Sequence, residues 1–294
     1  MKIGIYGIQF NEKKISIFQA LFQYLLRSAT GIHKVKIYQP FLEVLKGKVD
    51  GIDQFQSFDD STNISSLDLL LCLGGDGAIL DTLCLVKDSG VPVLGINTGR
   101  LGFLSSISEP AVESPLKEIL EGKFEVDARS VLKLSTKSKL FGELNYALNE
   151  ITVQKKDSSS MMIIHAYVDG EYLNSYWADG LIISTPTGST GYSLSCSGPI
   201  IMPGSEVFVL TPIAPHNLNV RPLVIPSNKE IRLKLEGREN EFLVALDSRG
   251  QAISSDEEII ISKGEFKMNI VRAKSHSFLS TLRNKLTWGL DSRN

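Results

Sequence analysis

The sequence predicts two domains, an amino-terminal open α/β domain followed by a carboxyl-terminal β-sandwich domain. At 294 residues the chain is longer than one hydrophobic core usually supports. Before Pro110, short apolar segments alternate with segments of helical periodicity, whereas regular strand-like segments separated by turn residues follow it. We therefore place the α/β domain at residues 1–108 and the sandwich at residues 109–274, and we expect residues 275–294 to pack back on the first domain.

The first domain is predicted as a parallel sheet whose strands are joined by helices. The segments predicted as strands are short and apolar: Lys2–Tyr6, Lys34–Tyr38, Leu69–Leu73 and Val91–Ile96. Helices are predicted where apolar residues recur every three or four positions: Ile15 to Leu25 after a cap at Asn11, Phe41 to Leu45, and Ala78 to about Lys87. The polar stretch Gln54–Ser66 is predicted to be a loop. Leu69–Leu73 is uninterrupted by polar residues, which is typical of a strand buried on both faces.

The second domain is predicted to be built of short strands, after a helix over Ser114–Glu121. The strand-like segments are Phe124–Leu134, Asn149–Gln154, Met162–Val168, Glu171–Trp177, Leu181–Ile183, Ile231–Leu235, Phe242–Leu246 and Glu258–Ile261. Asp169-Gly170, between two of them, is a strong hairpin signal. This pattern favours a β-sandwich, and an amphipathic stretch over Phe278–Leu286 predicts a closing helix.

Composition limits the classes of function. Hydrophobic residues make up 43% of the chain and charged residues 22%, as in ordinary soluble globular proteins. A net charge of -2 gives no electrostatic basis for nucleic-acid binding, and no apolar stretch approaches the roughly 20 residues of a membrane span. The amino end lacks a signal-peptide layout, and three scattered cysteines are predicted to be reduced, so we expect a cytoplasmic protein. The four histidines show no metal-ligand spacing, so no protein metal site is predicted.

The most informative stretch is a GGDG turn, residues 74–77, between the apolar strand Leu69–Leu73 and a helix. Its three glycines let the backbone turn sharply and present N–H groups to a ligand, and the following helix start favours phosphate. Gly74 and Gly75 are therefore candidate phosphate-binding residues. Asp76 would repel phosphate unless it binds a metal ion or takes a proton from a hydroxyl. The alternative is a plain strand–turn–helix corner with a solvated aspartate.

A second glycine-rich turn, residues 97–104 (NTGRLGFL), also follows a strand, but its spacing is not that of the dinucleotide fingerprint. It adds Arg100 as a candidate phosphate ligand. Further along, the loop TPTGSTGYS, residues 185–193, consists of glycines and hydroxyl-bearing residues apart from Pro186. Such a loop can cradle ribose or phosphate oxygens, or it can be an ordinary surface loop. The pair Asn149-Glu150 offers donors and acceptors to a ribose or base edge, although most such pairs lie in solvated turns.

In their order and spacing, GGDG, GINTGRLGFL, NE and DG followed by STPTGSTGYS resemble the NAD kinases, and the resemblance extends to the closing STLRNKLTWGL. GGDG alone is shared with diacylglycerol and sphingosine kinases. The resemblance implies an α/β domain followed by a β-sandwich. It also implies transfer of the γ-phosphoryl group of ATP to the 2′-hydroxyl of the adenosine ribose of NAD, with a divalent cation such as Mg²⁺. Family members are typically cytoplasmic homo-oligomers, so a homodimer or homotetramer is expected.

The resemblance also assigns roles residue by residue. Asp76 matches the family's proton acceptor. The residues matching NAD contacts are Asp76, Gly77, Asn149, Glu150, Asp179, Thr187, Thr190, Gly191, Tyr192, Ser193, Leu194, Ser195 and Ala214. Three positions depart from the family pattern, because Ala78 replaces a frequent Thr, Trp177 a frequent basic residue and Asp81 a frequent Arg. Which groups balance the pyrophosphate charge is therefore open, with Arg100 and the N–H groups of both turns as candidates.

The expected mechanism is positioning with charge neutralisation, because phosphoryl transfer has a loose transition state. A carboxylate is a weak base toward an alcohol, so we expect Asp76 to orient the hydroxyl and accept its proton late. One alternative is a lipid kinase that shares GGDG, but no basic amphipathic face for a bilayer is evident. Another is a non-catalytic sensor of NAD or ADP-ribose, against which the presence of Asp76 argues. A purely structural module would leave the glycine and hydroxyl clusters unexplained.

Overall fold

The computed structural model describes residues 1–28, 34–98, 102–105, 107, 113–156, 161–238, 240–272 and 277–287. The chain forms two compact units, one comprising Met1–Ala128 with Met268–Asn294 and the other Arg129–Lys267. Both division points fall inside long strands, β6 (Glu125–Ser135) and β17 (Ile259–Arg272). The domain boundaries proposed from composition, 108/109 and 274/275, stay a prediction.

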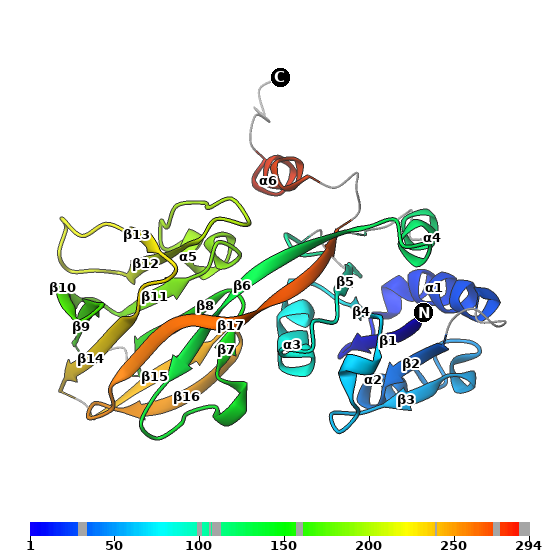
Figure 1. Cartoon of the computed structure of the whole chain (residues 1–294), viewed down its shortest axis with the longest axis horizontal. Coiled ribbons are helices and arrows are strands. Elements are labelled where there is room, and N and C mark those ends of the chain that lie inside the picture. Colours follow the sequence, from blue (N-terminus) through cyan, green and yellow to red (C-terminus); the bar gives the residue numbers. More distant parts are fainter. Residues whose placement is uncertain are drawn as a thin grey trace. The chain divides into compact units, whose positions relative to one another are not determined.

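The first unit contains a parallel sheet in the order β17-β5-β4-β1-β2-β3 (Figure 1). Its remaining strands are β1 (Lys2–Gly7), β2 (Lys34–Tyr38), β3 (Gln56–Phe58), β4 (Leu69–Leu73) and β5 (Val93–Ile96). The end of β17 joins the sheet where Ile270 pairs with Val93. All five residues of β4 are buried, as its uninterrupted apolar sequence predicts. β3 lies in the stretch predicted to be a loop, where the buried Phe58 holds the chain against β2.

The helices of the first unit are α1 (Ile15–Ser28), α2 (Gln39–Leu45), α3 (Asp76–Val86), α4 (Glu113–Leu120) and α6 (Phe278–Leu286). The helix α3 begins at Asp76, two residues before the predicted start, because the second glycine of the turn already acts as its N-cap. The predicted closing helix has the bounds of α6, and its Phe278 ring lies 6.3 Å from the Phe103 ring. None of the helices in the described part of the chain is long and apolar enough to cross a membrane.

The second unit is built of antiparallel strands in two layers. One has the order β10-β9-β14-β17, in which β6 pairs with β17 and β7 pairs with β6, and the other is a sheet of order β13-β12-β11-β8-β15-β16. The strands not yet given are β7 (Tyr146–Ala147), β8 (Glu150–Lys155), β9 (Met162–Val168), β10 (Glu171–Trp177), β11 (Gly180–Ser184), β12 (Val207–Ile213), β13 (Leu223–Pro226), β14 (Ile231–Gly237), β15 (Glu241–Leu246) and β16 (Arg249–Ser254). Alternate residues of both layers, such as Val153 of β8 and Ile164 of β9, share one buried core. The predicted fold class is confirmed.

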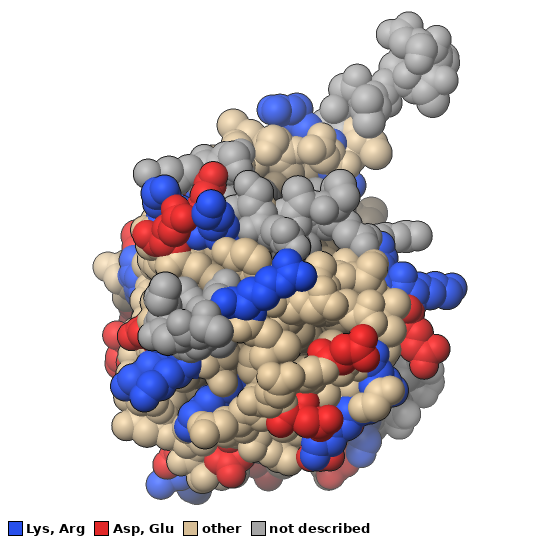
Figure 2. All heavy atoms as spheres, turned by 90° about the vertical axis from the view of Figure 1, so that its right-hand side faces the viewer, with Lys and Arg blue, Asp and Glu red and all other residues tan. Residues whose placement is uncertain are grey.

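Four strands of the second unit, β7, β12, β13 and β16, were not predicted from the sequence. In β12 a proline, Pro212, interrupts the apolar run, and β13 ends on another, Pro226. The local sequence of β12 and β13 therefore has only a weak strand preference, and pairing with neighbouring strands of the sheet determines their structure. On the face in Figure 2, the Lys and Arg side chains of the described residues are interspersed with Asp and Glu.

Candidate active site

The GGDG turn lies at the carboxyl end of β4, between β1 and β5, which is where open α/β sheets bind ligands. At Gly74 an added Cβ atom would lie 2.6 Å from Cβ of Ala78, so only glycine fits there. At Gly75 and Gly77, by contrast, an added Cβ atom would meet nothing within 4 Å. The turn thus leaves its backbone open at the start of α3, the end of a helix that attracts anions.

Asp76 is the first residue of α3, and its carboxylate is held by backbone hydrogen bonds. The N–H of Phe103 donates to Oδ2 at 2.7 Å, and the N–H of Leu104 donates to Oδ1 at 3.1 Å. A Cβ atom on Gly102 would overlap the carboxylate, so glycine is required there for this close approach. Each oxygen has accepted one of these bonds and can accept another. The second glycine-rich turn therefore fixes the orientation of Asp76, a role that the sequence did not indicate.

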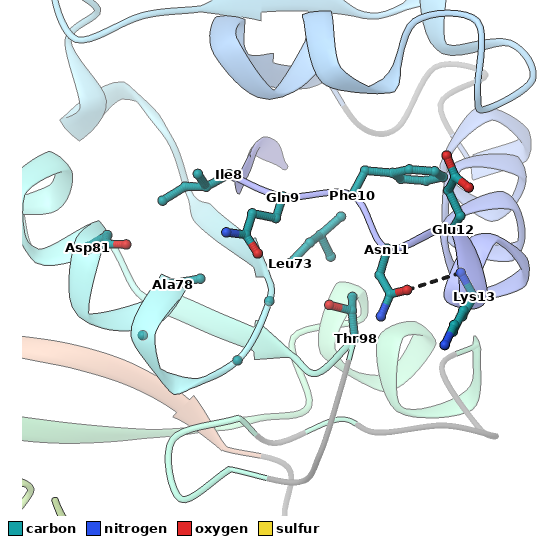
Figure 3. Close-up of a pocket in the computed structure, with 13 residues that line it drawn as sticks. Ile8, Gln9, Phe10, Asn11, Glu12, Lys13, Leu73, Ala78, Asp81 and Thr98 are labelled. Carbon is teal, nitrogen blue, oxygen red and sulfur yellow. Dashed lines mark hydrogen bonds between the residues drawn. The ribbon is translucent and has the colours of Figure 1, made fainter. Parts of the chain in front are cut away.

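A cavity of about 790 Å³ adjoins the GGDG turn. Figure 3 shows that it is bordered by residues following three neighbouring strands: Gln9 and Asn11 after β1, Ala78 and Asp81 on α3, and Thr98 after β5. Gly74, Gly75 and Gly77 also line it, and Lys13 is the one cation among its described lining residues. Arg100, the predicted phosphate ligand, lies outside the described residues.

In the second unit, Asn149 and Glu150 form a corner at the start of β8. The side chain of Glu150 is 9% exposed, and burial together with the charge of Asp247 raises its pKa to about 8. The N–H of Tyr192 donates to the Glu150 carboxyl group and thereby lowers its pKa, against the effect of burial. Oδ1 of Asn149 and Oε2 of Glu150 are buried and have no hydrogen-bond partner among the described residues. Such atoms are available for hydrogen bonds with a ligand.

The hydroxyl-rich loop lies directly against this corner. The N–H of Thr185 donates to the Asn149 carbonyl at 2.9 Å, and a Cβ atom on Gly188 would overlap that carbonyl. A Cβ atom on Gly191 would lie 3.0 Å from Oε2 of Glu150. The structure therefore brings together two groups of predicted site residues that lie about 40 residues apart in the sequence.

Most hydroxyls of the loop bind within the protein. Thr185 donates to the Leu148 carbonyl at 2.6 Å, Thr190 to the Thr187 carbonyl at 3.2 Å, and the Ser193 and Thr211 hydroxyls are 2.8 Å apart. The buried Thr187 accepts from Arg129 at 3.2 Å. Among the remaining predicted contacts, Leu194 is half-buried, whereas Tyr192 and Ser195 are exposed. The hydroxyls thus shape the loop in addition to any part they take in binding.

Asp179 and Ala214 lie at the other end of β11 from this corner. Gly180 pairs with Gln154 and Ile213, whereas Ser184, four residues on, pairs with Glu150. Asp179 forms an ion pair with Lys155 at 2.7 Å, and Ala214 is exposed with a φ of 44°. The structure therefore places the predicted NAD contacts of the second unit in two groups, separated by the length of one short strand.

Comparisons with known proteins identify the family. The sequence matches the ATP-NAD kinase N-terminal domain over residues 18–124 and the ATP-NAD kinase C-terminal domain over residues 148–273. An NAD kinase of Cytophaga hutchinsonii is 43% identical over 295 residues, and one of Flavobacterium psychrophilum is 46% identical over 297 residues, with 100% of each chain covered. The chain belongs to the NAD kinase family. The resemblance found in the motifs is thereby confirmed.

Solved structures of NAD kinases share this fold. An Archaeoglobus fulgidus NAD kinase in complex with ATP is 27% identical, with a TM-score of 0.73 over 98% of this chain and 99% of that one. Yeast NADH kinase complexed with NADH is 21% identical, with a TM-score of 0.81 over 99% of this chain and 88% of that one, which is a likeness of fold. Two further residues of this NAD kinase family member, Gly102 and Asp247, contact predicted site residues and were missed. A glycine and a hairpin aspartate give no local signal beyond a turn.

Proposed function

We propose that this phosphotransferase of the NAD kinase family uses Asp76 to orient the 2′-hydroxyl of the adenosine ribose of NAD for attack on the γ-phosphorus of ATP. ATP-dependent phosphorylation of NAD is the activity of the family. The observation that carries the role of Asp76 is its carboxylate, fixed by two N–H groups at the open start of α3. An acceptor atom held this way can align a hydroxyl before reaction, which is most of what a loose phosphoryl-transfer transition state needs.

Proton transfer from the hydroxyl completes the role of Asp76. As the bond between the hydroxyl oxygen and phosphorus forms, the oxygen becomes acidic and its proton passes to the carboxylate. ADP leaves with the electrons of the broken bond between the γ-phosphorus and its bridging oxygen. The carboxylate oxygens keep accepting from Phe103 and Leu104, so this step requires no rearrangement of the second glycine-rich turn.

The cavity beside GGDG is the proposed site of the donor phosphates. It adjoins the open backbone of Gly75 and Gly77 at the helix start, and Lys13 lines it. Gly74 and Gly75 keep their predicted role as phosphate ligands, because their side-chain-free backbone lines this space. Hydroxyl and amide groups of Thr98 and Gln9 offer further hydrogen bonds.

A divalent cation fits this donor site as a companion of the triphosphate. Among the described residues no three His, Cys, Asp or Glu side chains gather into a metal site. Mg²⁺ is commonly held by phosphates, waters and one or two carboxylates, and the cavity offers Glu12 and Asp81. Bound there, the ion would neutralise charge on the triphosphate. Lys13 and the backbone N–H groups would position the rest of the donor.

The NAD contacts proposed in the second unit are the residues implied by the family resemblance, with the corner Asn149-Glu150 at their centre. The unpartnered buried oxygens there can form hydrogen bonds with ribose hydroxyls and amides. A cytoplasmic homodimer or homotetramer is the proposed state of the protein, again on the family resemblance.

The deciding experiment measures NADP formation by the purified chain supplied with NAD, ATP and Mg²⁺, beside the variant Asp76→Asn. We expect the wild type to form NADP and the variant to lose kcat by about 10² to 10⁴, the usual effect of one acid–base group. NAD binding, measured by calorimetry, should be largely retained, because Asn preserves the shape. Normal turnover in the variant would refute the role of Asp76. NAD binding by a wild type that forms no NADP would instead indicate a sensor.

A further inference from the structure

Asp247 lies in the turn between β15 and β16 and binds three successive backbone N–H groups. Its Oδ2 accepts from Leu148 at 2.9 Å, and its Oδ1 accepts from Asn149 at 2.8 Å and from Glu150 at 3.1 Å. The N–H of Asp247 donates in turn to the Glu150 carbonyl at 3.0 Å. Four hydrogen bonds therefore attach this single turn residue to the segment 148–150.

The backbone of Asp247 is held in the left-handed region, with a φ of 52°, which is uncommon outside glycine but tolerated by Asp and Asn. Burial raises the pKa of its carboxyl group, while the three N–H donors and the neighbouring Arg249 act in the opposite direction. A buried carboxyl group in an unusual backbone conformation is maintained only where other interactions compensate. The compensation here is the three N–H groups, all of which belong to the corner Asn149-Glu150 or precede it directly.

We propose that Asp247 is a positioning residue for NAD, which fixes the segment 148–150 so that Oδ1 of Asn149 and Oε2 of Glu150 face the dinucleotide as unpaired hydrogen-bonding atoms. The inference rests on the proposed function, because it takes the corner as part of the NAD site. Both atoms are buried and lack a partner among the described residues, so a polar group of a ligand would find them already desolvated. Asp247 contributes no contact of its own to the ligand.

Asp247 also changes the charge state of the corner. Its negative charge is one of the two causes that raise the pKa of Glu150, the larger being burial. The groups that face Glu150 are Asp247 from the hairpin, with Arg249 beside it, and the N–H of Tyr192 from the hydroxyl-rich loop. Removing the charge of Asp247 should therefore shift the titration of Glu150 to lower pH. Loss of an interaction that does not face Glu150 would leave the pH dependence of NAD binding unchanged.

The test compares Asp247→Asn with the matched control Asp169→Asn. Asp169 is also a hairpin aspartate with a positive φ, of 50°, and accepts from the N–H of Glu230 at 2.9 Å, on strands that do not include the corner. For Asp247→Asn we expect the NAD dissociation constant and KM to rise about 10- to 100-fold, as when a buried donor loses its partner. kcat and the KM for ATP should stay within about 3-fold, and the pH midpoint of NAD affinity should move down. The control should change none of these.

Equal loss of kcat and of affinity for both substrates, or an unshifted pH midpoint, would overturn the proposal. Calorimetric NAD binding is read independently of turnover, so failure of Asp76 as the catalytic residue would not affect this outcome. A second measurement needs no variant: hydrogen exchange at the amides of residues 148–150 in the NAD-free wild type. Slow exchange that NAD leaves unchanged is expected of a preformed corner. Fast exchange that slows only with NAD would contradict the role of Asp247, even if Asp247→Asn fails to fold.

Discussion

Gly102 provides the space in which the carboxylate of Asp76 accepts its hydrogen bonds. A Cβ atom at Gly102 would overlap that carboxylate, and the next two residues, Phe103 and Leu104, donate to it through their N–H groups. The two residues belong to different turns that follow neighbouring parallel strands, β4 and β5. The position of the Asp76 carboxylate thus depends on a residue 26 positions later in the chain.

Gly102→Ala should displace the Asp76 carboxylate and lower kcat by about 10- to 100-fold, because a shift near 1 Å misaligns a reacting group. The NAD dissociation constant should change little. The measurement is steady-state NADP formation with calorimetric NAD binding. Gly250→Ala is the control, since an added Cβ atom there lies 3.6 Å from the nearest atom, an ordinary contact. A kcat for Gly102→Ala equal to that of the control would contradict this constraint on Asp76.

Lys13→Gln should raise the KM for ATP about 3- to 10-fold and leave the KM for NAD unchanged, because the variant removes a cation from the proposed donor cavity. Initial rates at varied ATP and at varied NAD distinguish the two constants. Lys46→Gln serves as the control, since Lys46 forms an ion pair with Glu43 at 2.7 Å and does not line that cavity. A change in the KM for NAD alone would contradict the place of Lys13 in the proposed donor site.

The buried carboxyl group of Glu150 should make the protein less stable as the pH rises. Its pKa lies at about 8 in the folded chain against 4.5 ordinarily, so between these values the folded state holds a proton that the unfolded state has released. Stability therefore falls with rising pH across this range, by about 1.4 kcal/mol for each unit of pKa difference. Asp247, whose pKa is also raised, contributes in the same direction.

Glu150→Gln should remove the part of this slope that Glu150 causes. Urea unfolding of both proteins at pH 5, 6, 7 and 8 measures this slope. The free energy of unfolding of the variant should rise relative to that of the wild type by on the order of a few kcal/mol from pH 5 to pH 8. Carboxyl groups with lowered pKa values, such as Glu206, have finished titrating below this range and do not obscure the difference. Parallel stability curves for the two proteins would show that Glu150 does not hold a proton in the folded state.

Thr187→Val should destabilise the second unit by about 1–3 kcal/mol, because the buried guanidinium of Arg129 loses an acceptor at 3.2 Å. Thr190→Val is the comparison, since the half-buried Thr190 hydroxyl donates only to a neutral carbonyl, that of Thr187. We expect it to lose roughly 1 kcal/mol. Chemical unfolding of both variants measures the two losses in unfolding free energy. A larger loss for Thr190→Val than for Thr187→Val would contradict the prediction.

Much of this molecule was predictable because its signals are local. The uninterrupted apolar run Leu69–Leu73 predicts a doubly buried strand, and the hairpin signal Asp169-Gly170 lies where β9 turns into β10. The start of α3 was misplaced by two residues, since the helical pattern of apolar residues begins only at Ala78, whereas the structure uses Gly75 as the cap. Strand β12 was missed because its place in the sheet, between β11 and β13, outweighs the proline in its sequence.

By itself the sequence determined the family and the two-part fold, and it predicted Asp76 as the catalytic residue, because glycine turns and alternating strands depend on neighbours along the chain. Only the tertiary structure decided what holds the functional groups. Gly102 and Asp247 contact Asp76 and Asn149 across 26 and 98 positions, and such contacts leave no trace in local periodicity. The raised pKa of Glu150 also could not be read from the sequence, since its causes, burial and the charge of Asp247, arise only when distant strands come together.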